Sequence, residues 1–89
     1  MLKQPNTKEK IVEFINEYFA KDSGVEIEYT TSFLDEEILD STGVMELVAF
    51  IETEFGIKVE DEEIIPDNLD SINKLVVFVD TKLENRPKV

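Results

Sequence analysis

The chain has 89 residues, 42% of them hydrophobic, which is enough for one small domain with a single core but not for a deep enclosed cavity. It has no cysteine and no histidine, which excludes disulfides, thiolate metal sites, cysteine nucleophiles and Ser-His-Asp hydrolases. Its 21 acidic and nine basic residues give a net charge of −12, which repels nucleic acid and anionic membranes. This charge indicates basic protein surfaces as partners, and the alternative is that it only keeps a small protein soluble.

Residues 1–5 contain no apolar stretch of signal-peptide length, and no apolar run approaches the roughly 20 residues that cross a bilayer. We therefore expect a cytoplasmic protein without a membrane span. We also expect it to be a monomer. Both ends resemble frayed tails, so we expect a single domain over residues 1–89 with an ordered core from about residue 6 to residue 84.

The first predicted element is an amphipathic helix over residues 7–21. Apolar residues recur there at helical spacing: Ile11, Phe14, Ile15, Tyr18 and Phe19. Asn6 followed by Glu9 resembles a capping box, and Gly24 is a suitable stop signal.

Residues 25–40 alternate apolar and polar side chains at Val25, Ile27 and Tyr29, which is a strand-like pattern. No second strand is available for pairing, and a lone strand cannot satisfy its own backbone. We therefore expect an extended loop that is fixed to the helices by four apolar side chains: Phe33, Leu34, Ile38 and Leu39.

The next helix is expected to begin at Asp40 or Ser41 and to end near Phe55, with Asp40 as N-cap and Gly56 as the C-terminal stop. Its core stripe consists of five residues: Val44, Leu47, Val48, Ile51 and Phe55. Gly43 in the first turn predicts a gap among the side chains near the helix start.

Residues 61–65 predict a short helical turn that is ended by Pro66, and Asp67-Asn68 predicts a further turn. The last helix is expected from Asp70 or Ser71 to about Leu83. Its stripe consists of Ile72, Leu75, Val76, Val79 and Leu83, whose helical spacing outweighs the strand propensity of the valines. The sequence therefore predicts an all-α protein with three main helices and one short helix.

Without histidine or cysteine, the chain is not expected to be an enzyme, and any chemistry must be brought by an attached group. A serine at a helix N-terminus suits such an attachment. A phosphodiester on Ser41 would lie where backbone N–H groups and the positive end of the helix dipole favour an anion. An arm that carries its own thiol would also explain why the chain needs no cysteine.

Three segments together resemble the acyl carrier proteins: Leu39-Asp40-Ser41, residues 43–48, and Phe55-Gly56-Ile57. The resemblance implies a small four-helix bundle in which Ser41 accepts 4′-phosphopantetheine from coenzyme A through a phosphopantetheinyl transferase. The arm would hold acyl intermediates as thioesters. The resemblance also implies that Asp40, beyond capping the helix, helps the transferase to recognise the site.

The chain departs from the family pattern at Thr42, where leucine is usual, and this suggests altered partner choice. Asp-Ser is a common N-cap pair and occurs three times, with its serine at Ser23, Ser41 and Ser71. Only Ser41 has the full downstream pattern. The Gly-Gly that precedes the serine of many peptidyl carriers is absent, which favours the acyl branch.

The resemblance further implies an acidic surface beside Ser41 that docks on basic patches of acyl-loading enzymes, synthases and acyltransferases. The residues expected in it are Thr42, Met45, Glu46, Ala49, Glu52, Asp61 and Glu62. A solvated face is the structural alternative for each acidic residue, and packing against the loop is the alternative for Met45. No acidic cluster follows the EF-hand pattern, so no metal site is expected.

Two other hypotheses fit the same residues. One is an aminoacyl or peptidyl type of carrier, and the other is an interaction module with the carrier fold that is never modified. Fatty acid, polyketide, lipopolysaccharide and amino-acid pathways are all compatible with the sequence. Identification of the loading enzyme, or exposure to a transferase and coenzyme A, would separate these hypotheses.

Overall fold

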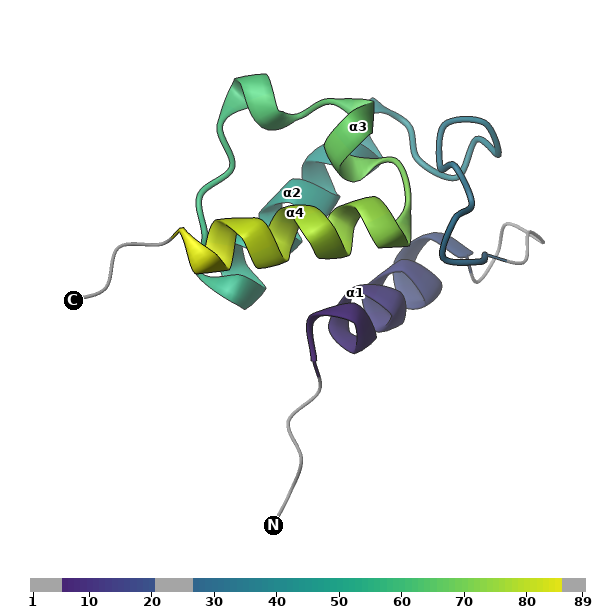
Figure 1. Cartoon of the computed structure of the whole chain (residues 1–89). Coiled ribbons are helices and arrows are strands. Elements are labelled where there is room, and N and C mark those ends of the chain that lie inside the picture. Colours follow the sequence, from purple (N-terminus) through teal and green to yellow (C-terminus); the bar gives the residue numbers. More distant parts are fainter. Residues whose placement is uncertain (1–5, 21–26, 86–89) are drawn as a thin grey trace, which may run out of the picture.

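The computed structural model describes residues 6–20 and 27–85, and this part of the chain is helical without any strand. Its elements are helix α1 (Thr7–Ile15), a π-helical turn (Asn16–Ala20), α2 (Ser41–Phe55), a 3₁₀ turn (Asp61–Glu63), α3 (Pro66–Leu69) and α4 (Ile72–Glu84). Helix α4 packs against each of the other three (Figure 1). The predicted all-α bundle with three main helices and one short helix is therefore confirmed.

Helix α1 begins as predicted, because the Asn6 side chain accepts a hydrogen bond from the Glu9 amide at 2.8 Å. Its buried residues, Ile11 and Ile15, face the core. The expected single α-helix to residue 21 is wrong from residue 16, where the chain widens into the π-helical turn. Lys21 and Gly24, the expected end and stop of this helix, lie outside the described residues.

The loop before α2 is fixed to the junction of α3 and α4. The Phe33 amide donates to the carbonyl oxygen of Asp70 at 2.8 Å, and the Asn73 amide donates to that of Tyr29 at 3.0 Å. Phe33 and Leu39 are buried as predicted, and Ile38 is half-buried. The expectation for Leu34 is wrong: its side chain is 50% exposed.

Helix α2 has the predicted bounds and cap residues. Gly56 ends it in the left-handed region, with φ at 66°, a conformation that glycine adopts without steric cost. The expected gap at Gly43 is absent. A Cβ on Gly43 would lie 3.2 Å from side-chain atoms of Leu39 and Phe19, so these two side chains already fill the space.

The segment around Pro66 differs from the prediction. Pro66 begins α3 instead of only ending a turn, and Asp67 and Asn68 lie inside this short helix. The reason is that the fixed φ of proline suits the first position of a helix, where its missing N–H costs nothing. Burial of Leu69 in the core then holds α3 in place.

Helix α4 begins after Ser71, whose hydroxyl accepts a hydrogen bond from the Lys74 amide at 3.1 Å. Ile72, Leu75 and Val79 are buried as predicted, and Phe78, which the expected stripe omits, is buried as well. The core within the described residues thus draws on all four α-helices and on the loops between them.

Candidate site for a prosthetic group

Ser41 is the first residue of α2 and is exposed to solvent. The residue before it, Asp40, caps the helix: its Oδ1 accepts a hydrogen bond from the Gly43 amide at 2.7 Å, and its carbonyl oxygen accepts one from the Val44 amide at 2.9 Å. The Ser41 hydroxyl forms no hydrogen bond with any described residue. The amides of Ser41 and Thr42 have no carbonyl of the same helix before them to accept their protons.

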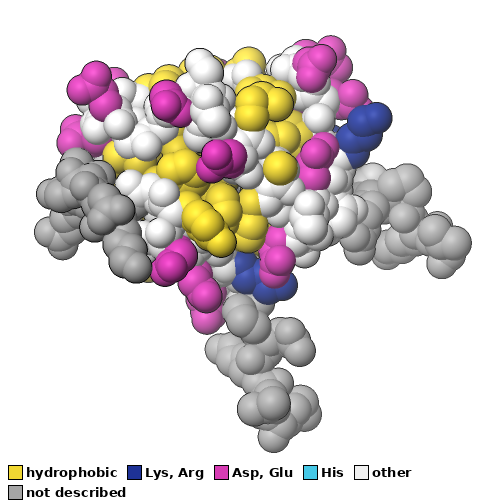
Figure 2. All heavy atoms as spheres, turned by 180° about the vertical axis from the view of Figure 1, so that it is seen from behind, with side chains coloured by type: hydrophobic (Ala, Val, Ile, Leu, Met, Phe, Trp, Pro, Cys, Tyr) yellow, Lys and Arg dark blue, Asp and Glu magenta, His cyan; other side chains and the backbone are white. Residues whose placement is uncertain are grey.

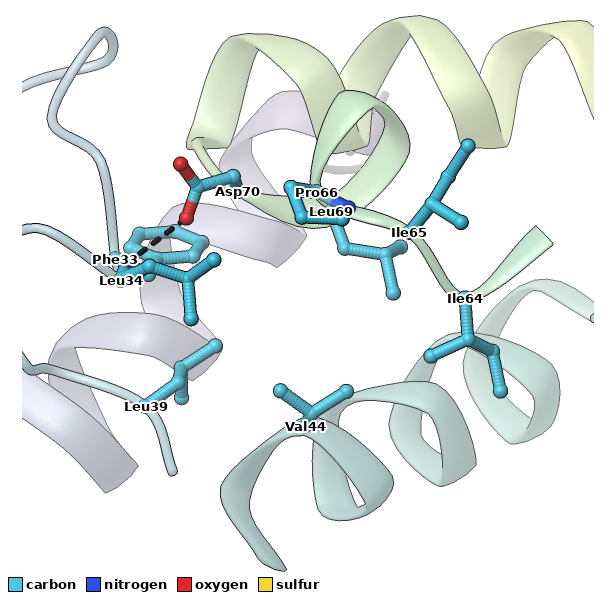
Figure 3. A pocket seen from close by; sticks show the side chains of 9 residues that line it. All are labelled: Phe33, Leu34, Leu39, Val44, Ile64, Ile65, Pro66, Leu69 and Asp70. Carbon is cyan, nitrogen blue, oxygen red and sulfur yellow. Dashed lines mark hydrogen bonds between the residues drawn. The ribbon is translucent and has the colours of Figure 1, made fainter. Parts of the chain in front are cut away.

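An apolar cavity of about 130 Å³ opens one helical turn from Ser41. Figure 3 shows Val44 of α2 facing Leu39 of the loop and Leu69 of α3 across it. Ile64 and Ile65 line the side toward the 3₁₀ turn. Its volume is close to the roughly 150 Å³ of a dry apolar cavity that takes up a benzene molecule, so it has room for a small apolar group.

Comparison with known proteins identifies the family. Residues 11–79 match the family described as "Phosphopantetheine attachment site". The chain is 35% identical over 80 residues to an acyl carrier protein of Exiguobacterium sp. (strain ATCC BAA-1283 / AT1b), covering 86% of this chain and 99% of the relative. The chain belongs to the acyl carrier protein family.

Relatives within this family differ in what their names say they carry. An acyl carrier protein of Streptococcus thermophilus (strain CNRZ 1066) is 38% identical over 74 residues, which are 83% of this chain and 92% of the relative. A D-alanyl carrier protein of S. thermophilus (strain ATCC BAA-491 / LMD-9) is 34% identical over 80 residues, which are 90% of this chain and 98% of the relative.

Phosphopantetheine is the cofactor of this acyl carrier protein family, and the start of α2 has the chemistry to accept it. An exposed hydroxyl is available at Ser41, and two helix-start amides lie beside it. The Asp40 carboxylate is held by the Gly43 amide. A shallow hollow of about 310 Å³ adjoins this helix start, between Thr42 and Glu46 on one side and the loop residues Glu37 and Ile38 on the other.

Another serine that follows an aspartate, Ser71, has a different environment in this carrier fold. It is 5% exposed, and its hydroxyl is engaged in capping α4. A transferase could therefore not reach it without opening the bundle. Ser23 lies outside the described residues.

The residues expected on the docking surface of the carrier differ in how far they are exposed to solvent. Thr42, Met45, Glu46 and Ala49 are exposed on α2, and Met45, at 56% exposure, does not pack under the loop. Asp61 and Glu62 are exposed on the 3₁₀ turn. Glu52 is half-buried, and its Oε2 accepts a hydrogen bond from the Val59 amide at 2.9 Å, so it braces the segment that follows α2.

Two acidic residues near this surface form ion pairs. Lys82 Nζ lies 2.8 Å from Glu63 Oε1, and Lys10 Nζ lies 3.3 Å from Glu54 Oε1. The hydrogen bond from Lys82, together with one from the Glu60 amide, lowers the pKa of Glu63 below its ordinary value of 4.5, and partial burial opposes this only weakly. Glu63 therefore stays ionised in mildly acidic solution.

Two residues also shape the site in roles that the sequence did not predict. Asp70 Oδ1 accepts a hydrogen bond from the Leu34 amide at 2.9 Å, and its Oδ2 accepts one from the Ser32 hydroxyl. Phe19 covers Gly43. Neither role leaves a local signal, because the partners are at least 24 residues apart in the sequence.

Within residues 6–20 and 27–85, no helix combines the length and apolar character that crossing a membrane requires. The same residues contain no group of three or more acidic side chains placed to hold a metal ion.

Proposed function

We propose that the chain is a carrier protein in which Ser41 holds 4′-phosphopantetheine, and that the loaded arm shuttles acyl intermediates between partner enzymes. The observation that carries this proposal is the exposure of Ser41 at the first position of α2, inside the segment that matches the family. When attached, phosphopantetheine supplies a thiol on a flexible arm, and that thiol holds the acyl group as a thioester. The chain itself would not be an enzyme.

The attachment step needs only one reacting atom from this chain. The Ser41 oxygen would displace 3′,5′-ADP from coenzyme A, so that a phosphodiester bond forms and a pyrophosphate P–O bond breaks. The hydroxyl proton would pass to a base of the transferase, since the chain has no histidine and the Asp40 carboxylate is engaged by Gly43. The amides of Ser41 and Thr42 would then face the phosphodiester anion.

The exposed residues of α2 and the 3₁₀ turn would dock on basic patches of the transferase, the loading enzyme, and synthases or acyltransferases. This rests on Thr42, Met45, Glu46 and Ala49 on α2 and on Asp61 and Glu62 of the 3₁₀ turn. Exposed rim charges of this kind act mainly on the association rate and its salt dependence. We further propose a monomeric single-domain carrier in the cytoplasm, where coenzyme A is available.

Intact mass spectrometry tests the proposal. The purified chain is incubated with coenzyme A and a broad-specificity phosphopantetheinyl transferase, beside Ser41→Ala and Ser71→Ala variants that are first checked for folding by circular dichroism. We expect the wild type and Ser71→Ala to gain one phosphopantetheine, and Ser41→Ala to gain none. A gain that survives in Ser41→Ala would move the site to another residue.

If the wild type gains nothing, Thr42→Leu is tested in the same assay. A gain only in that variant would show that the site is intact and that Thr42 restricts which transferases recognise it. No gain in either protein would favour the unmodified interaction module.

A second candidate cargo is an amino acid, because D-alanyl carrier proteins are among the relatives at 34% identity. The same Ser41 arm would serve both cargoes. Incubation of the modified protein with a D-alanine-activating ligase and, separately, with an acyl-activating ligase would distinguish them, with the added mass identifying the cargo. We expect the acyl group to be loaded in preference.

A further inference from the structure

Helices α1 and α2 and the π-helical turn expose an aromatic surface that the carrier proposal does not use. The rings of Phe14 and Phe50 stack with centroids 3.9 Å apart and planes inclined by 10°. The Tyr18 ring contacts the Phe14 ring, with centroids 4.8 Å apart and planes inclined by 38°, and Tyr18 is 66% exposed. Figure 2, a view from the side on which α2 lies, shows hydrophobic side chains gathered between acidic ones.

The aromatic groove, defined by Phe14, Tyr18 and Phe50, is made of two adjoining hollows of about 340 and 390 Å³ that share these residues. Carboxylates line both of its sides. Glu13 and Glu17 lie on the side of α1 and the π-helical turn, and Glu46 and Glu54 lie on the side of α2. Among the described residues that line it, Lys10 is the one lysine, and it is paired with Glu54.

The π-helical turn explains why so large a side chain remains outside. In an α-helix, residue i+4 lies on the same face as residue i, and Tyr18 accordingly contacts Phe14. The wider π-helical turn brings a second aromatic residue, Phe19, against Phe14 as well, with ring centroids 5.5 Å apart, and Phe19 also covers Gly43. The core is thus closed by Phe19, and Tyr18 is left for solvent. Single π-helical turns of this kind are common at functional sites.

The charges around the groove select its occupant. A second copy of this chain would set the same four carboxylates against each other while bringing together two molecules of charge −12. We propose that the groove binds an amphipathic basic helix of a partner protein. The apolar stripe of that helix would lie on the aromatic floor, and lysines or arginines on both sides of the stripe would pair with the two rows of carboxylates.

This proposal goes beyond the carrier function. The groove does not contain Ser41, so binding requires no phosphopantetheine. It shares Glu46 and Ala49 with the docking surface proposed above and continues from there onto α1. A partner helix bound here would hold the carrier from the α1 side and leave the apolar cavity near Val44 uncovered, because the two hollows share none of their described lining residues with that cavity.

The test uses the unmodified, ¹⁵N-labelled full chain and a synthetic peptide of about 15 residues, near the length at which an isolated helix becomes marginally stable. The peptide carries leucines at i, i+3, i+4 and i+7 with lysines on both flanks. We expect saturable amide shifts concentrated at Phe14, Tyr18, Ala49 and Phe50. A peptide with glutamates in place of the lysines should leave these amides unshifted.

Matched variants distinguish binding at the groove from nonspecific binding elsewhere on the surface. Tyr18→Ser should weaken peptide binding about tenfold, as loss of an aromatic anchor does. Val77→Ser removes an equally exposed apolar side chain on α4, at 66%, and should change binding less than about twofold. Glu17→Lys should weaken binding about threefold, and more than Asp80→Lys, which changes the charge equally but lies on α4.

The proposal is overturned by any of four results. These are absence of saturable binding, equal binding of the glutamate peptide, amide shifts centred on Asp61 and Glu62, or equal loss in Tyr18→Ser and Val77→Ser. A concentration-dependent dimer in sedimentation that Tyr18→Ser abolishes would also overturn it, because a second copy would then be the occupant. None of these results depends on whether Ser41 is modified.

Discussion

The same dipeptide, Asp-Ser, has opposite roles at two helix starts. Before α2, Asp40 is the N-cap, so Ser41 becomes the first helical residue and its hydroxyl is exposed. Before α4, the cap falls one residue later, on Ser71, and Asp70 turns its carboxylate to the loop. A shift of one residue in cap position therefore decides which serine is open to an incoming enzyme.

Glu63 and Lys82 give the protein one pH-dependent contact. We predict that Glu63→Gln lowers the free energy of unfolding at pH 7 by about 0.5 kcal/mol, the size usual for partly exposed ion pairs. This corresponds to a melting temperature roughly 3 °C lower for a domain of this size. Because the pKa of Glu63 is lowered in the folded state, the contribution is present above about pH 4.5 and is lost as the pH falls through the folded pKa.

Thermal melts of both proteins from pH 7 down to pH 3 measure this effect. The difference between wild type and Glu63→Gln should shrink toward zero in acid. Glu62→Gln, at an exposed neighbouring position, is the control and should follow the wild type throughout. A difference that stays constant with pH would assign the loss to packing instead of charge.

The loop that precedes α2 is held in place by the short helix α3 and by the junction between α3 and α4. Four residues are too few for a helix to be stable alone, so α3 persists because Leu69 is buried and its C-cap residue, Asp70, is bonded to the loop. Asp70 receives hydrogen bonds from the amides of Phe33 and Leu34 and from the Ser32 hydroxyl. One residue thus joins the loop to both C-terminal helices and limits the edge of the apolar cavity.

Replacing this carboxylate should loosen the loop. We predict that Asp70→Ala destabilises the fold by about 2 kcal/mol, because the Leu34 amide and the Ser32 hydroxyl lose their acceptor. Amide hydrogen exchange at Leu34 should be faster in Asp70→Ala than in the wild type, by at least the factor that the lower free energy of unfolding explains. Asp80→Ala, on the exposed face of α4, serves as control and should leave this exchange rate unchanged. Equal protection of Leu34 in both variants would contradict the prediction.

Negative charge dominates the molecule as a whole. With 21 acidic and nine basic residues, the repulsion is spread over all helices, and only two ion pairs offset it within residues 6–20 and 27–85. Its core is small, and a domain of this size buries only about 60–65% of the surface that its unfolded chain exposes. Modest stability and sensitivity to ions follow from these two properties.

We therefore predict that millimolar magnesium raises the melting temperature by a few degrees, and that calcium raises it by a similar amount. The expected similarity follows from loose association of divalent ions with the many carboxylates, which relieves their repulsion without a fixed coordination site, since the described residues offer no group of three acidic ligands. Sodium chloride at the same ionic strength is the control and should raise it less. An unchanged melting temperature would rule out this effect, and a much larger response to calcium would indicate a specific site.

The sequence alone determined the features that depend on neighbours within a few residues. The cap at Asp40, the start of α2 at Ser41 and the stop at Gly56 follow from hydrogen bonds and backbone angles that span at most four positions. The helical character of α1, α2 and α4 follows from apolar spacing in the same way. The candidate modification site at Ser41 is predicted from such local features together with the resemblance of the surrounding residue pattern to the family.

Tertiary packing decided the rest. Pro66 satisfies two local rules, ending one turn or beginning a helix, and the burial of Leu69 chose the second. The π-helical turn places Phe19 on Gly43, and the stack of Phe14 on Phe50 joins residues 36 positions apart. Asp70 accepts a hydrogen bond from Leu34, which is also 36 positions away in the sequence. These contacts form only when the chain is folded, because no local pattern records which distant side chain will meet a given surface.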